Sequence, residues 1–312
     1  MSTIPFVDLA AQQRTLGDRI QRAISRVLEH GSYIMGPEVF ELEDLLATRA
    51  QRRHCVTCAS GTDALQMALM ALGVGPGDRV VVPDFTFVAT AEAVRLVGAE
   101  PIFADVDPVT YNLDPESAEL AWELPGPSPV GVIAVDLFGH PARSSELELL
   151  AQRHDAWLVV DGAQSLGATR DDRSGIARGV IATTSFYPSK PLGAYGDGGA
   201  VFCDDDQLAS ALRSIRNHGA DAKPGCHDRV GLTGRLDTLQ AAVLLAKLEV
   251  FDAEIKDRQQ VAERYSEAVA GLVTPPKAEA GVEPVWAQYT VEIERREVIR
   301  SRMAEAGIPT FV

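Results

Sequence analysis

Short apolar runs alternate along most of this chain with amphipathic stretches of helical spacing, and this alternation limits the possible fold strongly. The runs are CVTCA, RVVVP, PIFADV, GVIAVDLF, WLVVD, VIATTSFY and GAVFC. Helical stretches such as DALQMALMALG, VATAEAVRLVG and SELELLAQRH follow several of them. Strands that alternate with helices form βαβ units, in which helices cover both faces of a mostly parallel sheet. We therefore expect one large α/β domain over about residues 50–235.

The pattern changes near residue 237. Apolar residues keep helical spacing from Thr238 to Ala270, which predicts a long helix or a pair of helices. The segment TPPKAEAGVEP is rich in Pro, Gly and Ala and predicts a hinge. Beyond it we expect a strand over Trp286–Ile293 and a helix over Val298–Ala306, which are too few elements to bury their own faces. The predicted domains are residues 1–237, comprising an N-terminal segment and the large domain, and residues 238–312, comprising a long linking helix and a partial small domain.

The net charge of the chain limits the classes of macromolecule that it can bind. The 312 residues include 44 acidic and 29 basic side chains, giving a formal net charge of −15 at pH 7. Such a chain repels nucleic acid and anionic membrane surfaces unless it has a basic patch, and its longest basic clusters are pairs such as Arg52-Arg53. The sequence also contains neither a run of roughly 20 apolar residues nor a typical secretory leader at its start. We expect a cytoplasmic protein without a nucleic-acid or membrane partner.

Two of the four cysteines, Cys55 and Cys58, form a CxxC pair, a spacing typical of zinc and redox sites. No second Cys/His pair at ligand spacing follows, and HCVTCASG has the pattern of a strand that enters a turn. We therefore interpret both thiols as structural and expect no metal.

Two segments just past predicted strands contain candidate binding residues, and an open parallel sheet places its ligands at such positions. In ASGTDAL a small-residue turn leads into a helix, and such a turn presents backbone N–H groups and a hydroxyl to an anion such as phosphate. An ordinary helix N-cap would explain the same residues. In WLVVDGAQ, Asp161 and Gln164 could hold a protonated heterocyclic nitrogen and a neighbouring ring hydroxyl. A hydrogen-bonded strand-end role for Asp161 is an equal alternative.

The third segment is SFYPSKPLGAYGDGG, which places Lys190 in a Ser/Pro/Gly-rich turn between two apolar strands. Lysines are normally solvated, but partial burial lowers the pKa of the amine and leaves it nucleophilic toward a carbonyl group. Lys190 is therefore a candidate for covalent binding of a carbonyl compound.

The order of these segments, a phosphate turn, Asp-x-x-Gln and then Ser-x-x-x-Ser-Lys, resembles the fold type I enzymes that use pyridoxal 5′-phosphate (PLP). The strings HGSYIMGPEVFELED, SGTDAL, VVVPDFTFVATAEAV, DGAQSLGA, SFYPSKPLGAYGDGGAVF and GRLDTLQAAVL are similar to the DegT family of nucleotide-sugar aminotransferases. The resemblance covers essentially the whole chain. It implies an α/β fold with a mostly parallel seven-stranded sheet flanked by helices, followed by a smaller α+β C-terminal domain that is incomplete here.

The resemblance implies roles at the cofactor ring. Lys190 would form the Schiff base with PLP and move the proton between the cofactor carbon and the sugar carbon. Asp161 would pair with the pyridine nitrogen, keeping it protonated, and Gln164 would contact the phenolic oxygen. Phe87 matches the aromatic residue that stacks on the ring, although from the sequence Phe85 and Phe87 are equally good core residues.

The resemblance also implies a phosphate site. Ser185 and Thr62, with the backbone of Gly61 and Asp63, would bind the phosphate of their own subunit. The family commonly has an Asn that reaches the phosphate of the partner subunit, and Thr233 stands in its place here, so the resemblance implies a homodimer. Family members also continue several dozen residues beyond GIPT, and we therefore expect a truncated C-terminus.

Within the family, the chain most resembles enzymes that aminate UDP-2-acetamido-2-deoxy-3-oxo-D-glucuronate, with glutamate as donor, in surface polysaccharide biosynthesis. A dTDP-keto-sugar aminotransferase is the nearest alternative, and a truncated PLP-binding homologue without transferase activity is another. A nicotinamide oxidoreductase is disfavoured because no GxGxxG follows a strand near the N-terminus. Relatives that catalyse dehydration lack the lysine, so Lys190 favours amino transfer.

Overall fold

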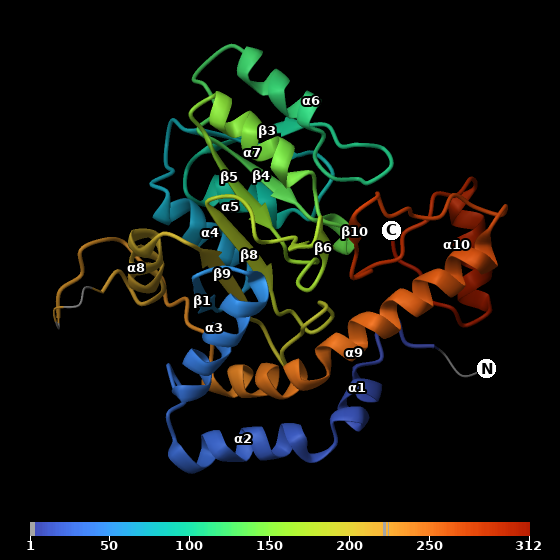
Figure 1. The fold of residues 1–312 in the computed structure, drawn as a ribbon, viewed down its shortest axis with the longest axis horizontal. Helices are drawn as coiled ribbons and strands as arrows, with labels where there is room; N and C mark the ends of the chain where they lie inside the picture. The colour runs from blue at the N-terminus through green and yellow to red at the C-terminus, as the bar shows by residue number, and fades with distance from the viewer. Residues whose placement is uncertain (1–3, 221–222, 224) are drawn as a thin grey trace.

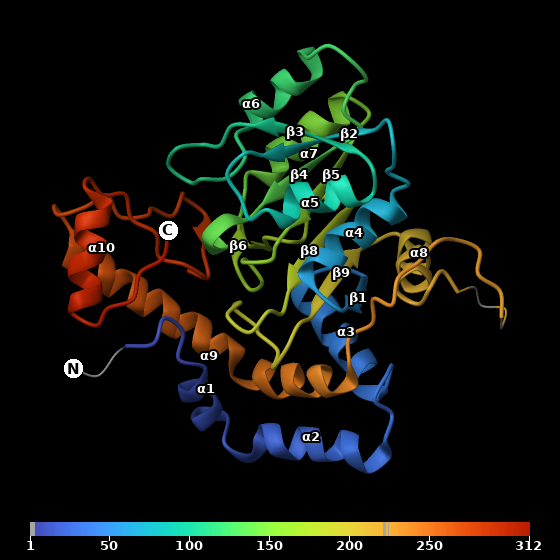
Figure 2. The ribbon, with the colours of Figure 1, turned by 180° about the vertical axis from the view of Figure 1, so that it is seen from behind.

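A seven-stranded sheet forms the centre of the molecule in the computed structural model, which describes residues 4–220, 223 and 225–312. Each of the seven apolar runs contributes one strand, which confirms the predicted sheet. Figures 1 and 2 show the strands surrounded by helices. In spatial order the strands are β1 (His54–Cys58), β9 (Gly199–Cys203), β8 (Ile181–Ser185), β5 (Trp157–Asp161), β4 (Gly131–Val135), β2 (Arg79–Pro83) and β3 (Glu100–Ala104).

The sheet is parallel from β8 to β3, whereas β9 runs antiparallel to both of its neighbours, β8 and β1. Because β1 and β8 both run opposite to β9, β1 has the same direction as the parallel strands. The carboxyl ends of β1, β5 and β8 therefore meet at one edge of the sheet, which is where an α/β fold places ligands.

Helices cover both faces, as the alternation predicts. One face packs against α3 (Pro37–Ala50), α6 (Pro115–Glu119), α7 (Ser144–Arg153) and the N-terminal part of α9 (Thr238–Val269). The other packs against α4 (Gly61–Ala71), α5 (Ala89–Leu96) and α8 (Asp206–Arg216). Short 3-10 helices lie at Leu120–Glu123 and Leu137–Gly139.

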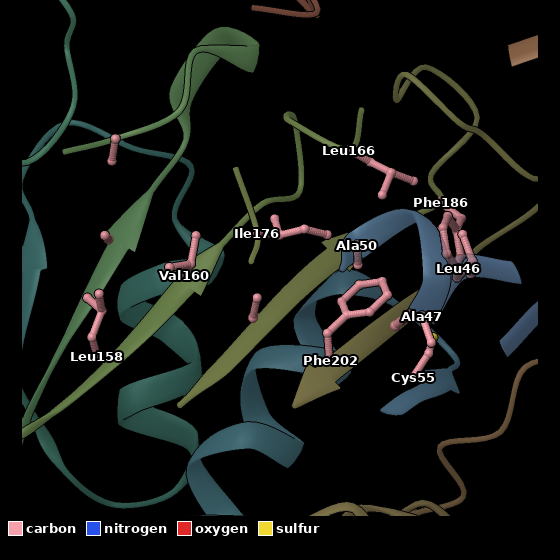
Figure 3. Close-up of a cluster of buried hydrophobic side chains, with 14 of the residues drawn as sticks. Leu46, Ala47, Ala50, Cys55, Leu158, Val160, Leu166, Ile176, Phe186 and Phe202 are labelled. Atoms are coloured by element: carbon pink, nitrogen blue, oxygen red, sulfur yellow. The ribbon is translucent and has the colours of Figure 1, made fainter. Parts of the chain in front are cut away.

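Successive strand residues enter opposite layers of the core. Leu158 and Val160 belong to the cluster on the α3 side, and Val159 lies in the cluster on the α4 side. Figure 3 shows Leu158 and Val160 with Phe202 of β9 and Leu46 of α3 in the first cluster. Burial on both faces explains why the strands are continuous apolar runs rather than alternating ones.

The same alternation separates the CxxC cysteines. Cys55 packs in the cluster on the α3 side, and Cys58 packs on the α4 side. The two thiols point to opposite faces of β1, so they cannot bind one metal ion together or form a disulfide with each other. Burial raises the pKa of both thiols, so neither has the thiolate character of a reactive cysteine.

A second helical layer lies below the sheet in Figure 1, where α9 crosses the molecule and α2 (Asp18–His30) runs beside it. Ile20, Ala23 and Val27 of α2 pack against Ala242, Val243 and Ala246 of α9. The helix α1 (Leu9–Leu16) precedes α2 and is separated from it by Gly17, whose φ is +53°. The segment after Thr238 is one continuous helix of 32 residues, not a pair.

The C-terminal region differs from the prediction. No strand forms over residues 286–293, and a two-residue strand, β10 (Val282–Glu283), pairs with β6 (Thr169–Arg170), which also pairs with β7 (Arg173–Ser174). The Trp286 indole N–H donates to Gln259 of α9 at 2.7 Å, and Glu292 forms an isolated antiparallel bridge with Thr274, so these two contacts hold the segment instead of a sheet. The predicted helix is present as α10 (Arg296–Glu305). The division into two domains stays a prediction.

In the described part of the chain, no helix combines the length and the apolar character needed to cross a membrane.

Candidate active site

The predicted phosphate turn lies directly against the end of β8. An ideal Cβ built on Gly61 would be 2.7 Å from Cβ of Ser185, so only a glycine allows the two segments to approach this closely. Gly199 of β9 pairs with both Cys58 and Ser185 in the sheet register and thereby places the two strand ends side by side. The fold brings the turn and the Ser185 hydroxyl together, as expected for two parts of one anion site.

Ser60 caps α4 at this turn. Its Oγ accepts the Asp63 N–H at 3.0 Å and also lies 2.9 Å from the Asp63 carboxylate. The N-cap interpretation is therefore correct for Ser60, and the Asp63 amide is already hydrogen-bonded inside the cap. The first amides of a helix have no intrahelical partner, so those of Gly61 and Thr62 are available to an anion at the positive end of the helix dipole.

Asp161 ends the central strand β5 and is 6% exposed. Burial raises the pKa of its carboxyl group, while the Ala163 N–H at 3.1 Å, the charge of Lys190 and the Thr90 hydroxyl at 3.2 Å oppose that shift. The contact to Ala163 is the strand-end hydrogen bond that the structural alternative requires. The nearby charge of Lys190 is a second feature of the site, and a strand-end role does not require it.

Lys190 lies in the loop between β8 and β9, and it is half-buried. The loop is closed by backbone bonds from Phe186 to Gly198 and from Ala194 to Phe186, each 2.7 Å long. Burial lowers the pKa of the Lys190 amine, and the negative charge of Asp161 opposes this shift. The structure thus places the amine and the carboxylate within each other's electrostatic field at the carboxyl edge of the sheet.

Gln164 is oriented by a residue that sequence analysis missed. Its Oε1 accepts the Phe138 N–H at 2.5 Å, and Phe138 has a left-handed backbone conformation with φ of 59°. With the carbonyl end held, the amide NH2 is the end available to an acceptor such as a phenolic oxygen. A positive φ at a phenylalanine has no signature in the sequence, so this anchor could not have been predicted.

Phe87 and Phe85 both lie at the surface, 69% and 50% exposed, so the suggestion that they are core residues is wrong for both. Phe85 forms an aromatic cluster with Tyr111 and Phe138, with ring centroids 6.0 and 6.3 Å away. The loop after β2 presents these rings outward instead of returning them to the core.

A second buried acid, Asp136, lies beside Asp161. It follows β4, and its backbone N–H donates to the Asp161 carbonyl at 3.0 Å. The carboxylate accepts the Ala142 N–H at 2.7 Å and the Ser165 hydroxyl at 2.6 Å, and burial raises its pKa to about 7. The sequence analysis did not single it out, although an Asp directly after an apolar run is the same signal that drew attention to Asp161.

Thr233 lies on the segment between α8 and α9 and is exposed. Its Oγ1 is 3.0 Å from Nε2 of His218, and Arg235 donates to Asn217 at 2.7 Å, so the segment is tied to the RNHG sequence. The backbone of Gly234 accepts the Ala59 N–H at 3.1 Å, which brings the segment next to the phosphate turn.

Comparison with protein families gives one match, which extends over residues 14–312: the DegT/DnrJ/EryC1/StrS aminotransferase family. A UDP-2-acetamido-2-deoxy-3-oxo-D-glucuronate aminotransferase of Pseudomonas aeruginosa is 48% identical over 99% of this chain and 85% of the relative. A dTDP-3-amino-3,4,6-trideoxy-alpha-D-glucose transaminase of Streptomyces venezuelae is 40% identical over 99% of this chain and 81% of the relative.

Solved structures show the same fold. A DegT DnrJ EryC1 StrS aminotransferase from Brucella abortus has a TM-score of 0.96 and 45% identity, and the match covers 98% of this chain and 83% of that one. NtdA from Bacillus subtilis, solved with the bound cofactor PMP, has a TM-score of 0.89 and 29% identity over 98% of this chain and 71% of that one.

Proposed function

Because this chain belongs to the DegT/DnrJ/EryC1/StrS aminotransferase family, we propose that it transfers an amino group from glutamate to UDP-2-acetamido-2-deoxy-3-oxo-D-glucuronate. The chain is a sugar aminotransferase of fold type I, and its cofactor is PLP. The observation that carries the choice of site is the half-buried amine of Lys190 in the field of Asp161 at the carboxyl edge of the sheet. The substrate is proposed from the Pseudomonas aeruginosa relative, and the pathway is surface polysaccharide biosynthesis.

The residues at the sheet edge fit PLP. A Cβ at Gly61 would fill the cradle against Ser185, so the glycine keeps room for a phosphate beside two hydroxyls and a helix N-terminus. The buried carboxyl group of Asp161 needs a cationic partner, and a protonated pyridine nitrogen is one. When bound, PLP supplies an electron sink that stabilises negative charge on the substrate carbon.

Lys190 is the proposed catalytic residue. Its amine would hold the cofactor covalently through the aldehyde carbon, and, once freed by the amino donor, it would move a proton at the reacting carbon of the donor or the sugar. The lowered pKa of the amine suits this work, because a base is effective only when part of it is unprotonated near the working pH.

Other residues orient the ring. Asp161 would hold the pyridine nitrogen in its protonated form, and the NH2 of Gln164 would donate to the phenolic oxygen. The exposed ring of Phe87 would stack on the cofactor face. At the phosphate we assign the Ser185 and Thr62 hydroxyls and the turn that begins at Gly61, while the amide of Asp63 acts through the cap.

We also propose a homodimer in which Thr233 reaches the phosphate of the partner subunit. Support comes from the exposed side chains of Tyr33 and Ile34, which a second copy would cover. All four cysteines are free thiols, which suits the reducing cytoplasm as the proposed location.

The function is tested by a half-reaction. We expect the purified enzyme to bind PLP in a form whose visible absorbance is lost with borohydride, leaving the cofactor attached to Lys190 in a peptide map. In a separate sample without borohydride, glutamate should convert the bound PLP to PMP, and the PMP enzyme should then aminate the UDP sugar faster than a dTDP keto sugar.

The control is Lys190→Ala, in which the covalent link and the half-reaction should disappear while phosphate contacts retain part of the PLP binding. Wild-type turnover in this variant would refute the role of Lys190. Cofactor binding without conversion by glutamate would instead identify a PLP-binding homologue without transferase activity, and faster amination of the dTDP sugar would refute the proposed substrate.

A further inference from the structure

We propose that Lys247 is a positioning residue for Lys190, holding from α9 the loop on which the reactive lysine lies. The inference rests on the proposed role of Lys190 in binding PLP. It concerns a lysine that the sequence analysis did not single out, because it lies within an amphipathic helical pattern where charged residues are ordinary.

The first observation is burial. Lys247 is 1% exposed, on a turn of α9 between the buried residues Leu244 and Phe251. A buried ammonium group destabilises a fold unless polar partners compensate for its lost hydration, and an apolar residue of similar size would stabilise this helix more. The contacts of the amine therefore have to explain why a lysine occupies this buried position.

Those contacts are with the loop between β8 and β9. The Lys247 Nζ donates to the Gly193 carbonyl at 2.6 Å and lies 4.5 Å from the centre of the Tyr195 ring, within cation–π range. Gly193 is three residues after Lys190. None of the ion pairs found in residues 4–220, 223 and 225–312 includes Lys247. The negative charge of Glu254 acts on the amine without forming an ion pair, and the hydrogen bond of the amine goes to the loop.

A second side chain of α9 holds the same loop. Gln240 accepts the Tyr195 N–H at 2.8 Å and donates to the Tyr195 carbonyl at 3.3 Å. Gln240 and Lys247 are two helical turns apart and therefore lie on one face of α9. In Figures 1 and 2 the loop after β8 descends to α9, where these contacts are made.

The segment from Pro188 to Tyr195, which these contacts hold, makes a tight turn. An ideal Cβ on Gly193 would be 2.4 Å from the Pro188 carbonyl oxygen, so the chain doubles back tightly just around Lys190. A turn rich in Gly, Pro and Ser has many alternative conformations when it is not held. Fixing the Gly193 carbonyl and the Tyr195 backbone selects one of them.

The consequence concerns the covalent step of cofactor binding. An amine held in place reacts with a nearby aldehyde at a high effective concentration, and a mobile amine does not. Loss of the Lys247 contact should therefore weaken the bond between Lys190 and PLP while leaving the phosphate and ring contacts unchanged. PMP has an amine in place of the aldehyde and cannot bond to Lys190, so its affinity reports only those other contacts.

The test is the ratio of PLP to PMP affinity in wild type, Lys247→Met and the matched control Lys256→Met, which changes an exposed lysine of the same helix. We expect Lys247→Met to reduce the preference for PLP over PMP about tenfold, the size of effect that one lost charge-assisted hydrogen bond produces. The PMP dissociation constant should change less than about twofold, and the control should match wild type.

Gln240→Leu is a second variant. It removes the hydrogen bonds to Tyr195 and leaves the buried Lys247 side chain in place. It should shift the ratio of PLP to PMP affinity in the same direction by a smaller factor. If Lys247→Met does not fold, this variant alone tests whether α9 positions the loop. An unchanged ratio, or an equal fall in both affinities, would overturn the positioning role. Failure of wild type to attach PLP to Lys190 would instead overturn the proposed function, so the two results are distinguishable.

Discussion

Asp136 and Asp161 show how neighbouring residues of one type acquire different properties. Both follow central strands, and burial raises the pKa of both carboxyl groups. Asp161 has the charge of Lys190 nearby, whereas Asp136 has the Ser165 hydroxyl and the Ala142 N–H as its direct partners. A cationic ring beside Asp161 would favour its ionised form, while Asp136 binds a proton at higher pH than a solvated aspartate does.

Asp136 should give the apoenzyme a measurable pH dependence of stability. Its folded pKa is about 7, above the usual value of 3.8, so the folded state binds a proton that the unfolded state releases. Stability is therefore lost as pH rises from about 4 to about 7, with a slope approaching about 1.4 kcal/mol per pH unit. Asp136→Asn removes this titration, so its free energy of unfolding relative to wild type should increase between pH 5 and pH 8.

Denaturant unfolding of both apo proteins at the two pH values measures the difference. A constant difference across this range would show that Asp136 has an ordinary pKa.

At the scale of elements, the site depends on contact between the start of α4 and the end of β8. The strand β1, which leads into α4, is separated from β8 in the sheet by β9, and Gly199 of β9 is registered with the ends of both strands. The turn is consequently supported by the sheet itself, which fixes the helix N-terminus relative to Ser185. A rigid support of this kind places binding groups more accurately than a free loop does.

Gly61→Ala tests this contact. Its new Cβ would lie 2.7 Å from Cβ of Ser185, so α4 must shift and the phosphate cradle must change shape. We expect PLP affinity to fall about tenfold, a change of about 1.4 kcal/mol. The melting temperature of the apoenzyme should change little, since alanine favours the helix while overpacking opposes it.

Gly75→Ala is the matched control because a Cβ there would meet no atom within 4 Å. Equal PLP affinity in Gly61→Ala and Gly75→Ala would contradict the proposed phosphate site.

At the scale of the whole molecule, the segment that contains Thr233 lies between α8 and α9 and borders the phosphate turn through Gly234. If this region completes the phosphate site of a partner subunit, the two sites are related by a two-fold axis. Cofactor binding and association then become linked, because a ligand that bridges subunits stabilises the bridged state.

Sedimentation at several protein concentrations should therefore show a tighter dimer with PLP than without it. Thr233→Ala should reduce this difference and weaken PLP binding, while leaving the secondary structure unchanged by circular dichroism. A monomer that binds PLP as tightly as the dimer would rule out the shared site.

The seven strands and the helices that cover them could be predicted from the sequence. A strand that is buried on both faces needs apolar residues at successive positions, so each strand is visible as a continuous apolar run. The positions of Asp161, Ser185 and Lys190 at one edge follow from the same order, since parallel strands share a direction. For the region around Trp286 the same approach was wrong, because its conformation depends on the side chain of Gln259 in α9.

Tertiary structure alone decided which contacts support the site. Gly193 and Lys247 are 54 residues apart, and the helical spacing does not distinguish Lys247 from Lys256, the exposed lysine of the same helix. Loop packing likewise determines that Phe87 is exposed and that the Phe138 N–H donates to Gln164. The spacing of apolar residues indicates which face of a helix or strand is buried. It does not indicate which side chains of other elements contact that face.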